Sequence, residues 1–191
     1  MAYEYDVFLS YRRQDPVGSW VGNHFDRELR QWLGQALPND AKIFRDEVDI
    51  RVGTEWPVEL ERALKASKVI VCVWSPDYFR SNWCLAEWIS MRERQKACGK
   101  TVVYAVKFSD GLHYPKEAQI TQQRDLSRFA FTPAQFRESS RYIEFQEAMR
   151  QMTEDLATTV LAAPPWDAGF PIVRPDDAPT APAPALPRFA A

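Results

Sequence analysis

Two side chains that could bind a substrate and act on it, Trp83 and Glu87, lie four residues apart in a segment with a helical pattern. Four residues correspond to ~400° of rotation on an α-helix, so both side chains lie on one face, one turn apart. An aromatic ring beside a carboxylate suits a flat heterocycle joined to a sugar, and the positive end of the helix dipole would favour ionised Glu87. The same spacing also fits a core tryptophan beside a glutamate that caps the helix or pairs with Arg80 or Arg12.

A cysteine nucleophile is a less favoured alternative. The three cysteines, Cys72, Cys84 and Cys98, lack the close spacing of zinc and redox sites, which favours reduced thiols and no bound metal. Cys84 would need a neighbouring base, and the chain contains two histidines, His24 and His113.

The elements that position these residues alternate between strands and helices. Strands are expected at 5–10, 42–45, 68–74 and 101–106, with a fifth near 129–131 in a less regular region. Helices are expected at 19–34, 83–96 and 139–161, and after a Thr54 cap, with Pro57 in the first turn. The buried face of that helix is expected to comprise Val58, Leu60, Ala63 and Leu64. Such alternation predicts an α/β fold with an open, doubly wound parallel sheet.

In an open parallel sheet, the ligand crevice lies beyond the carboxyl ends of the strands, where the winding direction reverses. Three polar and aromatic segments are expected to meet there, namely residues 10–15, 46–53 and 75–87. The first strand is not followed by a glycine-rich phosphate loop, which disfavours a Rossmann dehydrogenase or a P-loop nucleotide site.

Size and charge limit the classes of protein that remain. A chain of 191 residues suits one main domain, and its 46% hydrophobic content is typical of a packed globule. The formal net charge of -2 offers no general attraction for nucleic acid or an anionic membrane. The amino terminus lacks a signal-peptide pattern and no window holds ~18 uncharged apolar residues, so a cytoplasmic location is expected.

The composition changes near the carboxyl terminus, where eight of the 14 prolines follow residue 163. We therefore expect a domain over residues 1–162 and a disordered Pro/Ala-rich linker over 163–191, which would tether a further module. Trp166, Phe170, Pro171 and Ile172 could pack back on the domain before the linker begins.

Three sequence blocks, in order, resemble the Toll/interleukin-1 receptor (TIR) domain. They are Tyr5-Asp-Val-Phe-Leu-Ser-Tyr-Arg-Arg13, Phe44-Arg-Asp46 with Gly53 seven residues later, and residues 69–78 with Ser81-Asn-Trp-Cys-Leu-Ala-Glu87. The resemblance covers roughly residues 3–160 and implies a flavodoxin-like sheet of five parallel strands. Arg51 departs from the pattern, and residues 110–128 have no clear counterpart in it.

The resemblance implies two kinds of function. Many animal TIR domains are assembly modules, whereas bacterial, plant and axon-degeneration members cleave NAD⁺ at the nicotinamide ribose bond. Glu87 falls on the catalytic position of the enzymatic branch and Trp83 on the aromatic position before it. The remaining substrate-binding positions of the resemblance are Ser10, Tyr11, Arg12 and Asp46.

We therefore expect an NAD⁺ glycohydrolase or cyclase of the bacterial branch, with NAD⁺ as substrate and no cofactor. The alternative is a non-enzymatic scaffold that docks through the so-called BB loop, which contains Glu47, Asp49, Arg51 and Gly53. The implied partners are other TIR domains and a sensor module beyond the linker. The implied setting is innate immunity, such as bacterial antiphage defence.

Overall fold

A computed structural model describes residues 2–45, 58–109, 111–112 and 114–178 of the chain. Within these ranges, five parallel strands form one sheet in the order β2-β1-β3-β4-β5. The strands are β1 (Tyr5–Tyr11), β2 (Ile43–Arg45), β3 (Ser67–Trp74), β4 (Val103–Lys107) and β5 (Gln123–Asp125). This flavodoxin-like α/β order confirms the predicted fold class.

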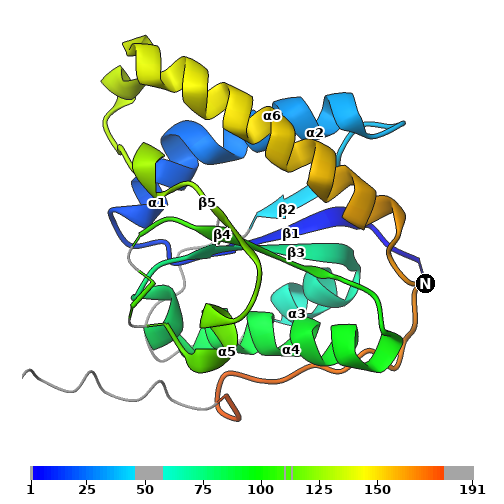
Figure 1. Cartoon of the computed structure of the whole chain (residues 1–191). Helices are drawn as coiled ribbons and strands as arrows, with labels where there is room; N and C mark the ends of the chain where they lie inside the picture. The colour runs from blue at the N-terminus through cyan, green and yellow to red at the C-terminus, as the bar shows by residue number, and fades with distance from the viewer. Residues whose placement is uncertain (1, 46–57, 110, 113, 179–191) are drawn as a thin grey trace, which may run out of the picture.

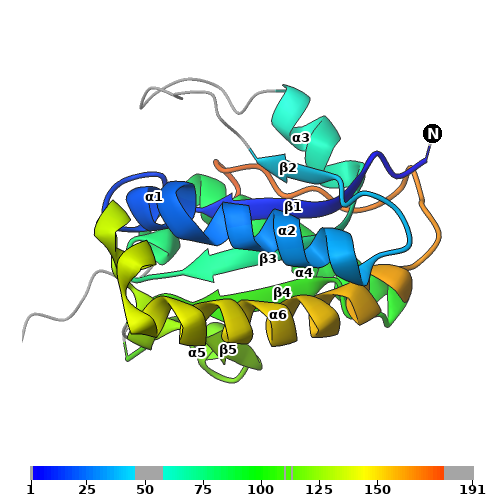
Figure 2. The same ribbon diagram turned by 90° about the horizontal axis from the view of Figure 1, so that it is seen from above.

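Helices cover both faces of the sheet (Figures 1 and 2). One face carries α1 (Val17–Trp20), a π-helical turn (Val21–Phe25), α2 (Asp26–Ala36) and α6 (Ser140–Leu161). The other carries α3 (Val58–Lys65), α4 (Asn82–Cys98) and the short α5 (Lys116–Gln119). Short 3-10 turns lie at Tyr78–Arg80, Ser127–Phe129 and Ala134–Glu138. Parallel strands are joined by right-handed crossovers that contain the helices. Because the chain moves from β1 toward one edge of the sheet and then toward the other, the helices lie on both faces.

The core has two layers because the side chains of a strand alternate between its faces. On β3, Val69, Val71 and Val73 join the layer under α2 and α6, whereas Ile70, Cys72 and Trp74 join the layer above α3 and α4. The apolar run of β3 is thus buried on both faces, as predicted for a central strand.

Two predictions about local structure were wrong. The fifth strand is Gln123–Asp125 and not Phe129-Ala130-Phe131, because an edge strand can be polar and pairs with β4 through its backbone. Phe129 instead lies in a 3-10 turn and is 1% exposed. Val58 was placed on the buried face of its helix, yet it is 84% exposed at the first position of α3, whereas Leu60, Ala63 and Leu64 are buried as predicted.

The ends of α4 match the prediction. The side chain of Ser81 accepts a hydrogen bond from the backbone N–H of Cys84 and caps the helix. Gly99 ends it with φ 63°, in the left-handed region that favours glycine. The Thr54 cap and Pro57 lie outside the described residues.

Residues 164–178 run along α4 and pack on it (Figure 1). Phe170 is 9% exposed, and the Arg94 guanidinium lies 4.1 Å from its ring centroid. The backbone N–H of Val173 donates to Ser90 Oγ at 2.8 Å. Packing of Phe170 and Ile172 on the domain is therefore confirmed.

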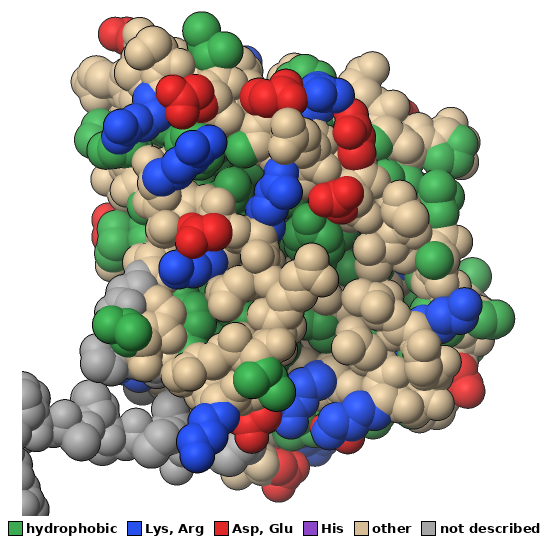
Figure 3. Space-filling model, viewed as in Figure 1, with side chains coloured by type: hydrophobic (Ala, Val, Ile, Leu, Met, Phe, Trp, Pro, Cys, Tyr) green, Lys and Arg blue, Asp and Glu red, His purple; other side chains and the backbone are tan. Residues whose placement is uncertain are grey.

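Figure 3 has the view of Figure 1, with α6 at the top and α5 at the bottom, and it shows acidic and basic side chains intermixed on this side of the molecule. On α6, Arg150 forms ion pairs with Glu147 and Glu154. None of the described helices is both long enough and apolar enough to cross a membrane.

Candidate functional site

The candidate site lies at the carboxyl ends of β1 and β3. These neighbouring strands mark the point where the strand order reverses, since β2 lies on one side of β1 and β3-β4-β5 on the other. Ser10 pairs in register with Cys72, and Tyr11 with Val73. The amino-terminal turns of α4 lie against this end of β1, which places Glu87 beside Ser10. Crevices in doubly wound sheets form at such a reversal.

Glu87 is a largely buried carboxyl group, 7% exposed. The Ser10 hydroxyl donates to its Oε2 at 2.5 Å, the length of a hydrogen bond to a charged acceptor. Burial raises the pKa of Glu87 to about 7, while the Ser10 hydrogen bond and the charge of Arg13 lower it. The helix dipole alone was expected to favour ionised Glu87. Loss of hydration outweighs it, so near neutral pH both protonation states are populated.

Ser10 is 1% exposed, and its hydroxyl contacts side chains of the protein. Besides Glu87, it lies 2.8 Å from the hydroxyl of Tyr78. Ser10 was predicted to bind substrate. In the structure it is buried, and its hydroxyl contacts the Glu87 carboxylate and the Tyr78 hydroxyl. Sequence reasoning did not assign a role to Tyr78. The signal for it was a tyrosine four residues after the buried strand β3, where a phenol would be enclosed and require a partner.

Trp83 lies in the first turn of α4, and Arg12, which follows β1, approaches the same end of the helix. Trp83 is half-buried against the core layer of α3 and α4, one turn before Glu87. Arg12 Nη1 donates to Ser81 Oγ at 3.4 Å, which brings its charge to the residue that caps α4. The structure thus brings Ser10, Arg12, Trp83 and Glu87 to one end of α4.

Tyr11 lies on the opposite face of β1, as strand alternation requires. Arg45 Nε donates to the Tyr11 hydroxyl at 3.0 Å, and Arg45 also pairs with Asp26 at 3.0 Å. The structure therefore does not bring Tyr11 beside Glu87. Asp46, Glu47, Asp49, Arg51 and Gly53 lie outside the described residues.

Among the described residues, which do not include His113, the geometry offers no support for the cysteine alternative. Burial and the neighbouring Glu87 raise the pKa of Cys84 to about 12, so its thiol stays protonated at neutral pH. His24 packs against Phe136 and Tyr142 under α6, on the other face of the sheet.

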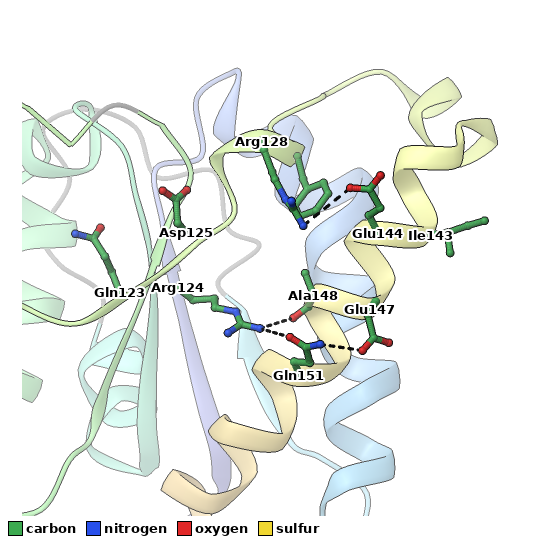
Figure 4. A pocket seen from close by; sticks show the side chains of 10 residues that line it. Gln123, Arg124, Asp125, Arg128, Ile143, Glu144, Glu147, Ala148 and Gln151 are labelled. Carbon is green, nitrogen blue, oxygen red and sulfur yellow. Dashed lines mark hydrogen bonds and ion pairs between the residues drawn. The ribbon is translucent and has the colours of Figure 1, made fainter.

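A hollow of ≈ 700 Å³ lies elsewhere, between β5 and α6 (Figure 4). Arg124 Nη2 donates to Gln151 Oε1 at 3.0 Å across it, and Arg128 faces Glu144. This hollow lies on the α6 side of the sheet edge, whereas Glu87 lies on the α4 side. Several of its polar groups pair with one another, and it is separated from Glu87 by the sheet, so its volume does not identify the candidate active site.

Comparison with known proteins identifies the family. Residues 7–139 match the TIR domain. "Disease resistance protein RPV1" of Vitis rotundifolia is 34% identical over 113 residues, which is 59% of this chain and 7% of that protein. "Probable 2' cyclic ADP-D-ribose synthase BdTIR" of Brachypodium distachyon is 29% identical over 130 residues, 66% of this chain and 54% of that protein.

Among solved structures, the TIR domains of the activated Roq1 resistosome share 22% identity, with a TM-score of 0.46. The match covers 84% of this chain and 86% of that one. The curated relatives described above are longer than the region they share with this chain. With its parallel five-stranded sheet and a match that spans residues 7–139, the chain belongs to the TIR domain family.

Proposed function

We propose that this chain cleaves NAD⁺ at the bond between nicotinamide and ribose, with Glu87 as the catalytic carboxylate. The observation that carries the proposal is a glutamate on α4, held by Ser10 where the strand order reverses. The similarity to a probable 2' cyclic ADP-D-ribose synthase supports the same substrate class. Trp83 would stack on a flat ring, and Arg12 at the start of α4 would face the anionic part of the substrate.

One carboxylate is enough for this reaction. Ordinary glycoside hydrolysis needs a general acid because the departing alkoxide is a poor leaving group. In NAD⁺ the ring nitrogen of nicotinamide is positively charged. When the C1′–N bond breaks, both electrons leave with that nitrogen, and nicotinamide departs neutral without a proton.

The charge that needs stabilisation then develops on the ribose. Ionised Glu87 would stabilise the positive charge that grows at C1′ and accept hydrogen bonds from the ribose hydroxyls. Water that attacks C1′ and loses a proton gives ADP-ribose. An oxygen or nitrogen of the substrate's own ribose or adenine that attacks C1′ instead gives a cyclic product.

Assembly with other TIR domains would control this activity. Loss of NAD⁺ harms the cell that makes the enzyme, so a lone domain should be nearly inactive. A sensor module beyond the carboxyl-terminal linker would detect a signal and cluster the domains. The disease resistance relatives support a role in immune signalling, of which antiphage defence is one form. Turnover per molecule should therefore rise with protein concentration or on fusion to an oligomeric partner, and equal rates would count against control by assembly.

A second candidate is a non-enzymatic assembly module, which the small exposure of Glu87, 7%, favours. The two functions differ in what Glu87 is needed for. A scaffold would keep its self-association after Glu87→Gln and would never release nicotinamide.

The test is to incubate concentrated protein with NAD⁺ and to identify the products by chromatography and mass spectrometry. Wild-type protein should release nicotinamide with ADP-ribose or a cyclic isomer, and Glu87→Gln should release neither. A matched control is Glu93→Gln on the same helix, because the Glu93 side chain is 38% exposed and pairs with Lys96. Its activity should equal that of the wild type.

A further inference from the structure

Three buried polar groups from three separate elements form a chain of contacts. Ser10 on β1 donates to Glu87 Oε2 on α4 at 2.5 Å, and Tyr78 in the 3-10 turn lies 2.8 Å from Ser10 Oγ. Tyr78 is 0% exposed and Ser10 is 1% exposed. Buried hydroxyls at these distances form a fixed network rather than solvated contacts.

The direction of the hydrogen bonds follows from counting protons. A serine hydroxyl carries one proton, and Ser10 gives it to Glu87, so at the other contact Ser10 must accept the proton of Tyr78. Burial raises the pKa of Tyr78 well above its ordinary value, so the phenol keeps its proton at neutral pH. Both hydroxyl dipoles then point toward the carboxylate.

We propose that Tyr78 and Ser10 are positioning residues, a buried relay that orients the Glu87 carboxylate and stabilises its charged form for NAD⁺ cleavage. This inference rests on the proposed function and adds two residues to it. Neither residue contacts substrate: Ser10 acts on Glu87 directly, and Tyr78 acts on Glu87 through Ser10.

The surroundings of Glu87 have opposing effects on its pKa. Burial favours a neutral carboxyl. Burial, together with the charge of Glu87, in turn raises the pKa of Cys72, Cys84 and Tyr78, so these side chains stay neutral beside it. The charge of Arg13 and the Ser10 hydrogen bond favour the ionised form. The relay thus opposes the burial that raises the pKa of Glu87, and it keeps part of the carboxylate ionised near neutral pH.

The experiment measures kcat/KM for NAD⁺ cleavage against pH in wild-type protein, Ser10→Ala, Tyr78→Phe and the double variant. Loss of one hydrogen bond to a charged group raises the pKa of that group by about one unit. The acid limb of the kcat/KM profile should therefore lie about one unit higher in pH in Ser10→Ala than in wild type. Its loss of activity should be about tenfold greater at low pH than at high pH. Tyr78→Phe should move the limb in the same direction by a smaller amount.

The double variant separates a relay from two independent effects. Because Tyr78 acts through Ser10, the double variant should behave like Ser10→Ala alone. A matched control is Tyr114→Phe, which removes another buried tyrosine hydroxyl, one that lies 2.8 Å from two backbone acceptors, Trp74 O and Ser109 O. It should leave the acid limb unmoved.

A second readout does not depend on activity. Titration of ¹³C-labelled glutamate by NMR, with the Glu87 signal assigned from its loss in Glu87→Gln, gives the pKa of Glu87 in each folded variant. The relay predicts a higher pKa in Ser10→Ala and, by less, in Tyr78→Phe.

The outcomes separate the two claims. If wild-type protein cleaves NAD⁺ and Glu87→Gln does not, but Ser10→Ala leaves both the acid limb and the pKa unchanged, the relay is wrong and the proposed function stands. Additive shifts in the double variant also overturn the relay. If wild-type protein never releases nicotinamide, the proposed function is wrong, and the NMR titration alone then decides whether the relay stabilises ionised Glu87.

Discussion

Replacement of Glu87 by glutamine should stabilise the protein at alkaline pH, although it removes the proposed catalytic group. Burial raises the pKa of Glu87 from the ordinary 4.5 to about 7, so the folded protein holds a proton that the unfolded chain releases. The stabilising effect of that proton is fully present below the unfolded value and is lost as the pH rises through the folded value. The difference between the folded and unfolded pKa values corresponds to about 3 kcal/mol in the free energy of unfolding.

Glutamine resembles the protonated carboxyl in shape and does not ionise, and its amide oxygen can still accept from Ser10. The free energy of unfolding should therefore be similar in wild type and Glu87→Gln at about pH 4.5. The variant should become the more stable by about 3 kcal/mol at about pH 8, a rise in Tm of about 6–12 °C for a domain of this size.

The assay is urea unfolding at a series of pH values, because urea adds no salt that would screen charges. A matched control is Glu147→Gln on α6, where hydrogen bonds from Arg150 hold the pKa below its ordinary value. Any pH dependence of that control should have the opposite sign. A constant difference between wild type and Glu87→Gln across the pH range would refute the argument from burial.

Three further predictions concern activity and the carboxyl-terminal segment. NAD⁺ cleavage should rise with pH and reach half its plateau near pH 7, because ionised Glu87 stabilises the ribosyl cation; a flat kcat/KM profile would contradict this. Cys84→Ala should keep activity within about threefold of wild type, since a thiol with a pKa of about 12 is no nucleophile, and a loss of about 100-fold in nicotinamide release would contradict this. Phe170→Ala should lower the free energy of unfolding in urea by about 3 kcal/mol, because it removes a buried ring and its contact with Arg94; a change below about 1 kcal/mol would mean that residues 164–178 add little to the folded unit.

The fold was largely predictable because its central elements carry strong local patterns. The apolar run of β3 and the Ser81 and Gly99 signals of α4 each specify an element without help from the rest of the chain. The fifth strand was not predictable in this way. Gln123–Asp125 has no strand-like pattern, and only pairing with β4 makes it a strand, whereas the apolar Phe129 is buried in a turn.

The candidate site was predictable in its residues and less so in their roles. The spacing of Trp83 and Glu87 identifies the start of α4, but the contact between Ser10 and Glu87 joins residues 77 positions apart. Only the packing of α4 against β1 shows that Ser10 holds the carboxylate. The pKa of Glu87 depends on the same packing, because desolvation is a property of the folded chain and not of the helix alone.

The most direct test of the central claim is the rate of nicotinamide release from NAD⁺ by concentrated protein at about pH 8, where Glu87 is mostly ionised. We predict measurable release by wild-type protein and by Glu93→Gln. Release by Glu87→Gln should be lower by at least about 100-fold, the usual loss when one charge-stabilising group is removed. Equal release by Glu87→Gln and wild type would show that Glu87 is not the catalytic carboxylate.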